Sequence, residues 1–407
     1  MTGAPLAGTL SFLLPDPPAA ALLAVCLRPA RAREAWRAWE RGGGDLDDHR
    51  SLLPLLDEGA RRGGVELPAA IGARLAGARL HETLRLAAIR ALARDALDRL
   101  AGAGIEPLVI QDLALAETAY EDPALRHCHA LDLLLPPGTV AGAAAALAGG
   151  GFEARPPTPG PWKEIVHASG FPVRLGEVPV PGFPASGEAA RLEARSRPAT
   201  IAGRPARVLA PEDALAIACG RAAVSAERRT LLWACDAARL VESGAELDWD
   251  GVVGAATGRG LELPLAAMLG WLSSELGVPV PAAAIEELER RSRDRPVEPV
   301  LDCVRADGRA SPGALLRRAA GWRERWTVIR WTAFPSTDRL RRSYPDAPLP
   351  VLYLARPLRW AIRALTRRAG PPGPGRGDRA RGAGTAAAHS GGRPGPAAGP
   401  PSASRRS

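Results

Sequence analysis

The most informative segment of this chain is Tyr120-Glu-Asp-Pro-Ala-Leu-Arg126-His-Cys-His-Ala130-Leu-Asp132-Leu-Leu-Leu135. Its Asp-Pro pair indicates a turn. The apolar run that follows Ala130 predicts a short strand, because buried strands are continuous apolar segments bounded by turn signals. One carboxylate, Asp132, lies near the start of this run. The stretch therefore predicts a turn, an arginine, and then a strand that carries a single carboxylate.

The residues on both sides of this stretch predict a small mixed α/β unit. Upstream, residues 105–110 predict a short strand and residues 112–119 a helix. Downstream, residues 139–147 predict another helix, which ends at a run of three glycines. The Pro- and Gly-rich region that follows predicts further strands and a hairpin. These lie at residues 166–169, 171–175 and 178–180, with the hairpin formed by 199–202 and 206–209.

The chain around this unit predicts helices. Before it, leucines recur at three- and four-residue steps, as one face of a long helix requires. After it, Pro211-Glu212-Asp213 is a good helix start. Helices are expected at residues 212–224, 227–243, 249–258, 261–277 and 281–292. The predicted organisation is an N-terminal helical region (1–104), an α/β core (105–209), a helical domain (210–312), a basic helical segment (313–368) and a disordered tail (369–407).

The charge distribution and the cysteine content indicate which partners and which cellular compartment to expect for this protein. The formal charge of +9 arises at the C-terminal end, where residues 313–368 contain thirteen arginines and three acidic residues. Such a segment would suit nucleic acid or a membrane surface, or it is a solvated basic helix. The five cysteines form no CxxC pair, which favours reduced thiols in a cytoplasmic protein. No apolar run reaches the length of a transmembrane helix.

The motif resembles the signature of the uncharacterised nucleotidyltransferase family, whose members belong to the DNA polymerase β-like superfamily. That signature is Tyr-x-Asp-Pro-x-Leu-Arg, followed by an Asp-x-Asp strand. Here Ala130 replaces its first aspartate and Asp132 keeps the second. Weaker similarities continue through Pro211-Glu212-Asp213 and the Trp233–Arg239 helix, so the resemblance covers roughly residues 20–368. It implies a helix-rich α/β fold with a small polymerase β-like core.

The resemblance also implies a chemistry, in which Mg²⁺ assists the transfer of a nucleotidyl group from an NTP to an acceptor that the sequence does not identify. Asp132 would be the remaining catalytic residue and metal ligand. Arg126, Arg174 and Gln111 would contact phosphates. Arg174 stands at the family's third carboxylate, and Gln111 with Asp112 replaces its Lys-Gly pair.

These replacements leave a second hypothesis open: a non-catalytic nucleotide-binding or partner-binding descendant, such as an accessory protein in a natural-product pathway. A transition-metal site at His127, Cys128 and His129 is a further alternative. Trp233, Asp236, Arg239 and Trp249 are expected to be structural, as parts of amphipathic helices with an intramolecular Asp–Arg or tryptophan contact. Nothing in the chain matches a P-loop, GxGxxG, HExxH or GxSxG motif.

Overall fold

The computed structural model describes most of the first 293 residues of the 407-residue chain. The described residues are 10, 13–154, 162–181, 183–185, 187–225, 230–243, 247–293 and, further on, 322, 325, 326 and 329. The basic segment predicted at 313–368, apart from those four positions, and the tail predicted at 369–407 lie outside them. Cys303 also lies outside them.

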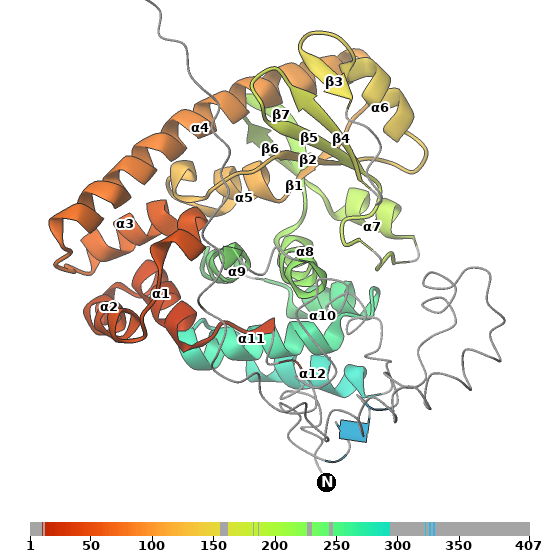
Figure 1. The fold of residues 1–407 in the computed structure, drawn as a ribbon. Helices are drawn as coiled ribbons and strands as arrows, with labels where there is room; N and C mark the ends of the chain where they lie inside the picture. The colour runs from red at the N-terminus through yellow and green to blue at the C-terminus, as the bar shows by residue number, and fades with distance from the viewer. Residues whose placement is uncertain are drawn as a thin grey trace, which may run out of the picture. The chain divides into compact units, whose positions relative to one another are not determined.

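The N-terminal region is helical, as the leucine spacing predicts. Asp16 caps the first helix by accepting a hydrogen bond from the backbone N–H of Ala19 (3.0 Å). The fourth helix is 34 residues long and runs along one edge of the described chain (Figure 1). The helices are α1 (Pro17–Leu27), α2 (Ala32–Arg41), α3 (Leu53–Arg62) and α4 (Ala69–Gly102).

One mixed sheet forms the centre of the α/β unit, with seven strands in the order β3-β4-β5-β2-β1-β7-β6. Central β1 is antiparallel to β2 and parallel to β7, while β2 is parallel to β5. The strands are β1 (Leu108–Ile110), β2 (Leu131–Leu134), β3 (Phe152–Ala154), β4 (Trp162–His167), β5 (Pro172–Gly176), β6 (Arg197–Ile201) and β7 (Arg204–Val208). The turn and strand predicted from the opening stretch therefore become the middle of a sheet.

The two faces of the sheet pack against different helices. Val109 and Leu133 belong to a core with Ile89 and Leu92 of α4 and with α6 (Val140–Leu147). Ile110, on the other face, belongs to a larger core that includes the N-terminal and C-terminal helices. Alternate residues of a strand point to opposite faces of the sheet. A residue that is aligned with Ile110 on the neighbouring strand therefore lies on the face that the C-terminal helices cover.

In the described residues up to 293, five helices follow the sheet, close to the five helices predicted between residues 212 and 292. Figure 1 shows α8 and α9 beneath the sheet and α10 to α12 beyond them. None of the described helices combines the length and the apolar character needed to cross a bilayer. The helices are α8 (Pro211–Val224), α9 (Leu232–Glu242), α10 (Trp249–Thr257), α11 (Glu262–Leu276) and α12 (Ala282–Ser292).

The structure corrects the sequence prediction in the segment between residues 150 and 196. The strand β3 and the helix α7 (Glu188–Arg195) were not predicted, and residues 178–180 form no strand. The strand predicted at 166–169 begins earlier, at Trp162, because β4 follows the register of β5 to Gly176. Pairing with a neighbouring strand, rather than local composition, sets these boundaries.

Glu58 of α3 is expected to make stability depend on pH. Its carboxylate accepts hydrogen bonds from Arg61, Arg62 and Arg79 at 2.6–2.8 Å. The bonds from Arg61, with those from the other two arginines, lower the pKa of Glu58 from 4.5 to about 2 although burial opposes them. The folded-state pKa is below the unfolded value, so this stabilisation is present above pH 4.5 and is lost as the pH falls towards 2.

The measurement is urea unfolding of the wild type and of Glu58→Gln at several pH values between about 6 and 3. The wild type should be the more stable protein at the upper end, and the difference should shrink as the pH falls. A difference that stayed constant over this range would contradict the role given to Glu58.

Candidate functional site

A row of polar side chains crosses the sheet on the face covered by the C-terminal helices. Residues aligned on neighbouring strands share a face, and the strand register aligns Asp132 with Ile110 on one side and with Arg174 on the other. Arg174 is in turn aligned with Glu164 of β4. Helix α8 places Arg221 over this row. The predicted neighbours Asp132 and Arg174 are therefore brought together by the fold.

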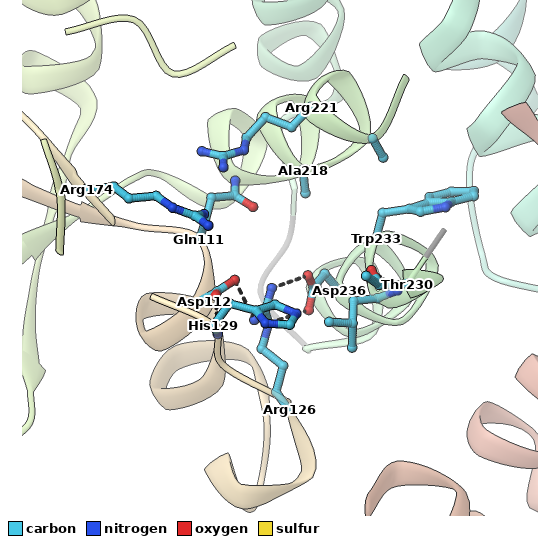
Figure 2. A pocket seen from close by; sticks show the side chains of 12 residues that line it. Gln111, Asp112, Arg126, His129, Arg174, Ala218, Arg221, Thr230, Trp233 and Asp236 are labelled. Carbon is cyan, nitrogen blue, oxygen red and sulfur yellow. Dashed lines mark hydrogen bonds and ion pairs between the residues drawn. The ribbon is translucent and has the colours of Figure 1, made fainter. Parts of the chain in front are cut away.

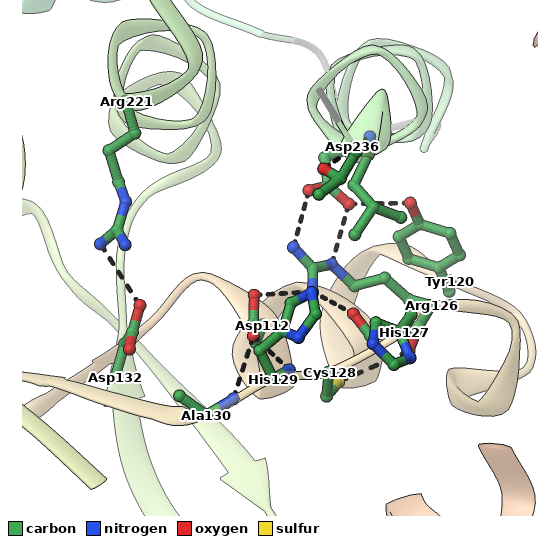
Figure 3. A network of polar contacts seen from close by, with 12 residues as sticks. Asp112, Tyr120, Arg126, His127, Cys128, His129, Ala130, Asp132, Arg221 and Asp236 are labelled. Atoms are coloured by element: carbon green, nitrogen blue, oxygen red, sulfur yellow. Dashed lines mark hydrogen bonds and ion pairs between the residues drawn. The ribbon is translucent and has the colours of Figure 1, made fainter. Parts of the chain in front are cut away.

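Asp132 lies between two guanidinium groups. Its Oδ2 is 3.3 Å from Nη1 of Arg221, and its Oδ1 is 3.7 Å from Nη1 of Arg174 (Figure 3 shows the first contact). The Asp132 side chain is 1% exposed, so solvent screens these attractions weakly. Arg221 also lies over the ring of Trp162, 5.4 Å from its centroid. Cationic side chains therefore occupy the surroundings of the one carboxylate that the motif retains.

A second carboxylate, Asp112 at the start of helix α5 (Asp112–Ala119), holds the chain just before β2. Its Oδ2 accepts hydrogen bonds from the backbone N–H groups of His129 (2.6 Å) and Ala130 (3.2 Å), and Oδ1 accepts one from Arg126 (2.8 Å). Burial alone would raise the pKa of Asp112, but Arg126 and His129 hold it well below its ordinary value. Ala130 is fully buried, so its methyl group lies where no solvent reaches.

Arg126 joins the sheet unit to α9. Its Nε and Nη2 donate to the two oxygens of Asp236 at 3.0 and 2.9 Å, and the hydroxyl of Tyr120 donates to Asp236 at 2.8 Å. The Arg126 and Asp236 side chains are each 3% exposed. Against the effect of burial, Asp236 and Asp112 raise the pKa of Arg126 well above its ordinary value. The phosphate role predicted for Arg126 stays a prediction; here its guanidinium binds two carboxylates (Figure 3).

A cavity of about 310 Å³ opens beside these residues. Figure 2 shows Arg174, Arg221 and Gln111 converging at one side of it. Gln111 has φ 55° and ψ −133°, a backbone conformation that is strained for a residue with a side chain. Its buried Nε2 has no hydrogen-bond partner among the residues that the structure describes. The predicted phosphate contacts Gln111 and Arg174 thus line one cavity, which continues past Ala218 and Trp233 of the helical region.

The side chains around Asp132 do not provide the ligand atoms that Mg²⁺ requires. The ion requires several oxygen ligands, whereas the strand offers one carboxylate with arginines at 3.3 and 3.7 Å. The side chains of the alternative transition-metal cluster at residues 127–129 are also engaged in other interactions. His127 Nδ1 is 2.6 Å from a carboxylate oxygen of Glu82, and burial raises the pKa of Cys128. In the part of the chain that the structure describes, no three His, Cys, Asp or Glu residues are grouped as a metal site.

Comparison with known proteins gives one match. The uncharacterised nucleotidyltransferase family matches residues 46–276, which is more than half of the chain. The chain belongs to this family. No curated protein and no solved structure matches it. The family match includes every residue that lines the cavity, so the departures at Ala130 and Arg174 occur within a nucleotidyltransferase-family domain and not beside one.

Three residues of this nucleotidyltransferase-family site lie beyond the predicted set. The resemblance assigns no site role to Arg221, and it marks Asp112 only as the replacement of a glycine. The sequence predicts an intramolecular arginine or tryptophan contact for Asp236, and the structure pairs it with Arg126 of the sheet unit. The sequence signal that could identify such residues is a charged residue at a position predicted to be buried, since buried charges are almost always paired.

Proposed function

We propose that this protein is a non-catalytic nucleotidyltransferase-family member that binds an NTP or another phosphate-bearing ligand without a metal ion. The observation that carries the proposal is the position of Arg174 and Arg221 on either side of Asp132. Catalysis in this superfamily needs carboxylates around Mg²⁺. Guanidinium groups bind phosphate oxygens directly and can use two N–H groups at once.

Arg174 is the better placed of the two arginines to bind a ligand. Its side chain is 32% exposed, and its contacts to Asp132 and Glu164 are both 3.7 Å, longer than a charge-assisted hydrogen bond of about 2.7–2.9 Å. The unpartnered Nε2 of Gln111 adds another donor on the same side of the cavity. An acceptor-rich group such as a phosphate matches this set of donors.

The cavity volume limits the part of a ligand that it encloses. About 310 Å³ is near the lower end for a small-molecule site, so we expect it to hold the phosphates while the rest of a nucleotide extends out of the opening. Arg126 would support the ligand site only indirectly. Its Nη1 donates to Asp112, and Asp112 in turn holds the chain just before β2.

The test is equilibrium binding of an NTP to the full-length protein, with Mg²⁺ and with a chelator. We expect the same affinity in both conditions. Arg174→Gln should weaken binding roughly 10- to 100-fold, since hydrogen bonds to charged groups contribute about 1.5–3 kcal/mol. Arg204→Gln is the matched control, because Arg204 pairs with Asp98 on the protein surface, outside the cavity.

The competing hypothesis is that the ancestral reaction survives with Asp132 as its only strand carboxylate. Incubation with labelled NTP and Mg²⁺ separates the two hypotheses. Transfer of label that Asp132→Ala abolishes and that the chelator stops would contradict the proposal. NTP binding that requires Mg²⁺ would contradict it as well, even without transfer.

A further inference from the structure

The indole ring of Trp162 covers a glycine on the neighbouring strand. Trp162 is the first residue of β4 and is aligned with Gly176, the last residue of β5. A Cβ atom added to Gly176 would lie 2.5–2.7 Å from three atoms of this ring. The φ of Gly176 is not positive, so its backbone conformation would also suit alanine. Gly176 is therefore needed for the space that the ring occupies.

The same ring also contacts the guanidinium group of Arg221 on α8. Arg221 Cζ lies 5.4 Å from the ring centroid, within the roughly 6 Å over which a cation–π contact is favourable. The Arg221 side chain is 7% exposed, so little solvent competes with this contact. The ring of Trp162 therefore joins the sheet to α8 beside the row of polar side chains that includes Asp132.

Two arginines lie within reach of the carboxylate of Asp132. Nη1 of Arg221 is 3.3 Å from Oδ2, and Nη1 of Arg174 is 3.7 Å from Oδ1. The Asp132 side chain is 1% exposed, and a buried charge that loses one partner attracts its other partner more strongly. The position of Arg221 therefore influences the position of Arg174.

We propose that Trp162 is a positioning residue of the ligand site: it holds Arg221 beside Asp132 and so leaves Arg174 available to bind phosphate. The inference rests on the proposed function, because it concerns the same phosphate-bearing ligand. Without the ring, Arg221 would be able to move away from Asp132. Arg174 would then move onto Asp132 and turn away from the cavity, which both arginines line. The ligand would lose the guanidinium group that is best placed to bind it.

The first test compares the ligand affinity of variants at position 162 in the full-length protein. The probe is whichever of ATP, GTP, CTP and UTP binds the wild type most tightly in the presence of a chelator. Trp162→Leu should weaken binding roughly 3- to 30-fold, the range expected from loss of a cation–π contact. Trp162→Phe keeps an aromatic ring and should stay within about two-fold of the wild type. Circular dichroism and urea unfolding check that each variant is folded.

A matched control removes a different tryptophan. Trp249, at the start of α10, is also half-buried and packs against the same core as Trp162. Among the residues that the structure describes, it makes no cation–π contact with an arginine. Trp249→Leu should therefore bind the probe as tightly as the wild type.

Double variants test whether Trp162 acts through Arg221. In an Arg221→Gln background, Trp162→Leu should have no further effect on affinity, because the guanidinium group that the ring holds is absent. Arg221→Lys serves the same purpose if Arg221→Gln does not fold, since lysine keeps the charge beside Asp132 but lacks the planar group that stacks. Gly176→Ala should weaken binding as Trp162→Leu does, because the added Cβ displaces the ring, and it should have no further effect once the ring is removed.

The outcomes separate this inference from the proposed function. If Trp162→Leu binds the probe as tightly as the wild type while Arg174→Gln binds it more weakly, the inference is overturned and the proposed function stands. An equal effect of Trp162→Leu with and without Arg221 would overturn the inference as well. A wild type that binds none of the four nucleotides would overturn the proposed function and the inference together.

Discussion

Asp236→Ala is expected to lower the free energy of unfolding by about 3–5 kcal/mol, which is the cost of removing one partner from a buried ion pair. Asp236 accepts two hydrogen bonds from Arg126 and one from Tyr120. All three side chains are buried. Without Asp236 the guanidinium stays inside the protein with Asp112 as its remaining carboxylate partner, and the Tyr120 hydroxyl loses its acceptor.

Urea unfolding measures this change, with two comparisons that isolate its cause. Asp98→Ala removes a carboxylate that also forms two hydrogen bonds to an arginine, but both side chains are about half exposed, so solvent screens the pair and the expected loss is much smaller. Arg126→Met/Asp236→Leu removes both charges of the pair but leaves Asp112 without its arginine, so it should also be less stable than the wild type. If Asp236→Ala cost no more than Asp98→Ala, the buried pair would not join the sheet unit to α9 as described.

Gly59→Ala is expected to cost about 3 kcal/mol, at the upper end of what overpacking a core costs. Gly59 lies where α3 crosses α1, and a Cβ atom there would be 2.1 Å from the carbonyl oxygen of Val25 and 2.9 Å from the Cα of Cys26. Both are backbone atoms, so no side-chain rotation can relieve the clash. The two helices would have to move apart and open the N-terminal core.

The same substitution at Gly72 provides a matched control with the opposite sign. Gly72 lies in α4, and a Cβ atom there would meet nothing within 4 Å. Gly72→Ala should therefore stabilise the protein by about 0.5–1 kcal/mol, because alanine loses less conformational freedom in a helix. Thermal or urea unfolding of the two variants measures the difference. A Gly59→Ala protein as stable as the wild type would contradict the close packing of α1 and α3.

Where the sequence contains strong local signals, it predicts the elements closely. The helix expected at 112–119 and the strand expected from Leu131 occur as predicted, and the hairpin forms around Gly203. A run of apolar residues, a turn and a positive-φ glycine each act over a few positions. The segment that was predicted poorly, around β3 and α7, is rich in Pro and Gly. There β3 is set by pairing with β4, and β4 by pairing with β5, which a local pattern does not contain.

The site was predictable only in part for a similar reason. The resemblance placed Asp132, Arg174 and Gln111 near one another, and the structure brings them to one region. The pairing of Arg126 with Asp236 connects residues 110 positions apart. Asp236 pairs with Arg126, and not with Arg239 of its own helix, because of how α9 packs on the sheet unit. That choice is a property of tertiary structure.

The parallel pairing of β1 with β7 has a consequence for synthesis on the ribosome. Antiparallel β2 follows β1 closely in sequence, but β7 lies almost 100 residues further along the chain. At about 5–20 residues per second, one edge of β1 would wait roughly 5–20 seconds for its neighbour. During that interval the nascent chain would expose an unpaired apolar edge. Slower translation of residues 111–208 should therefore increase aggregation of the newly made protein.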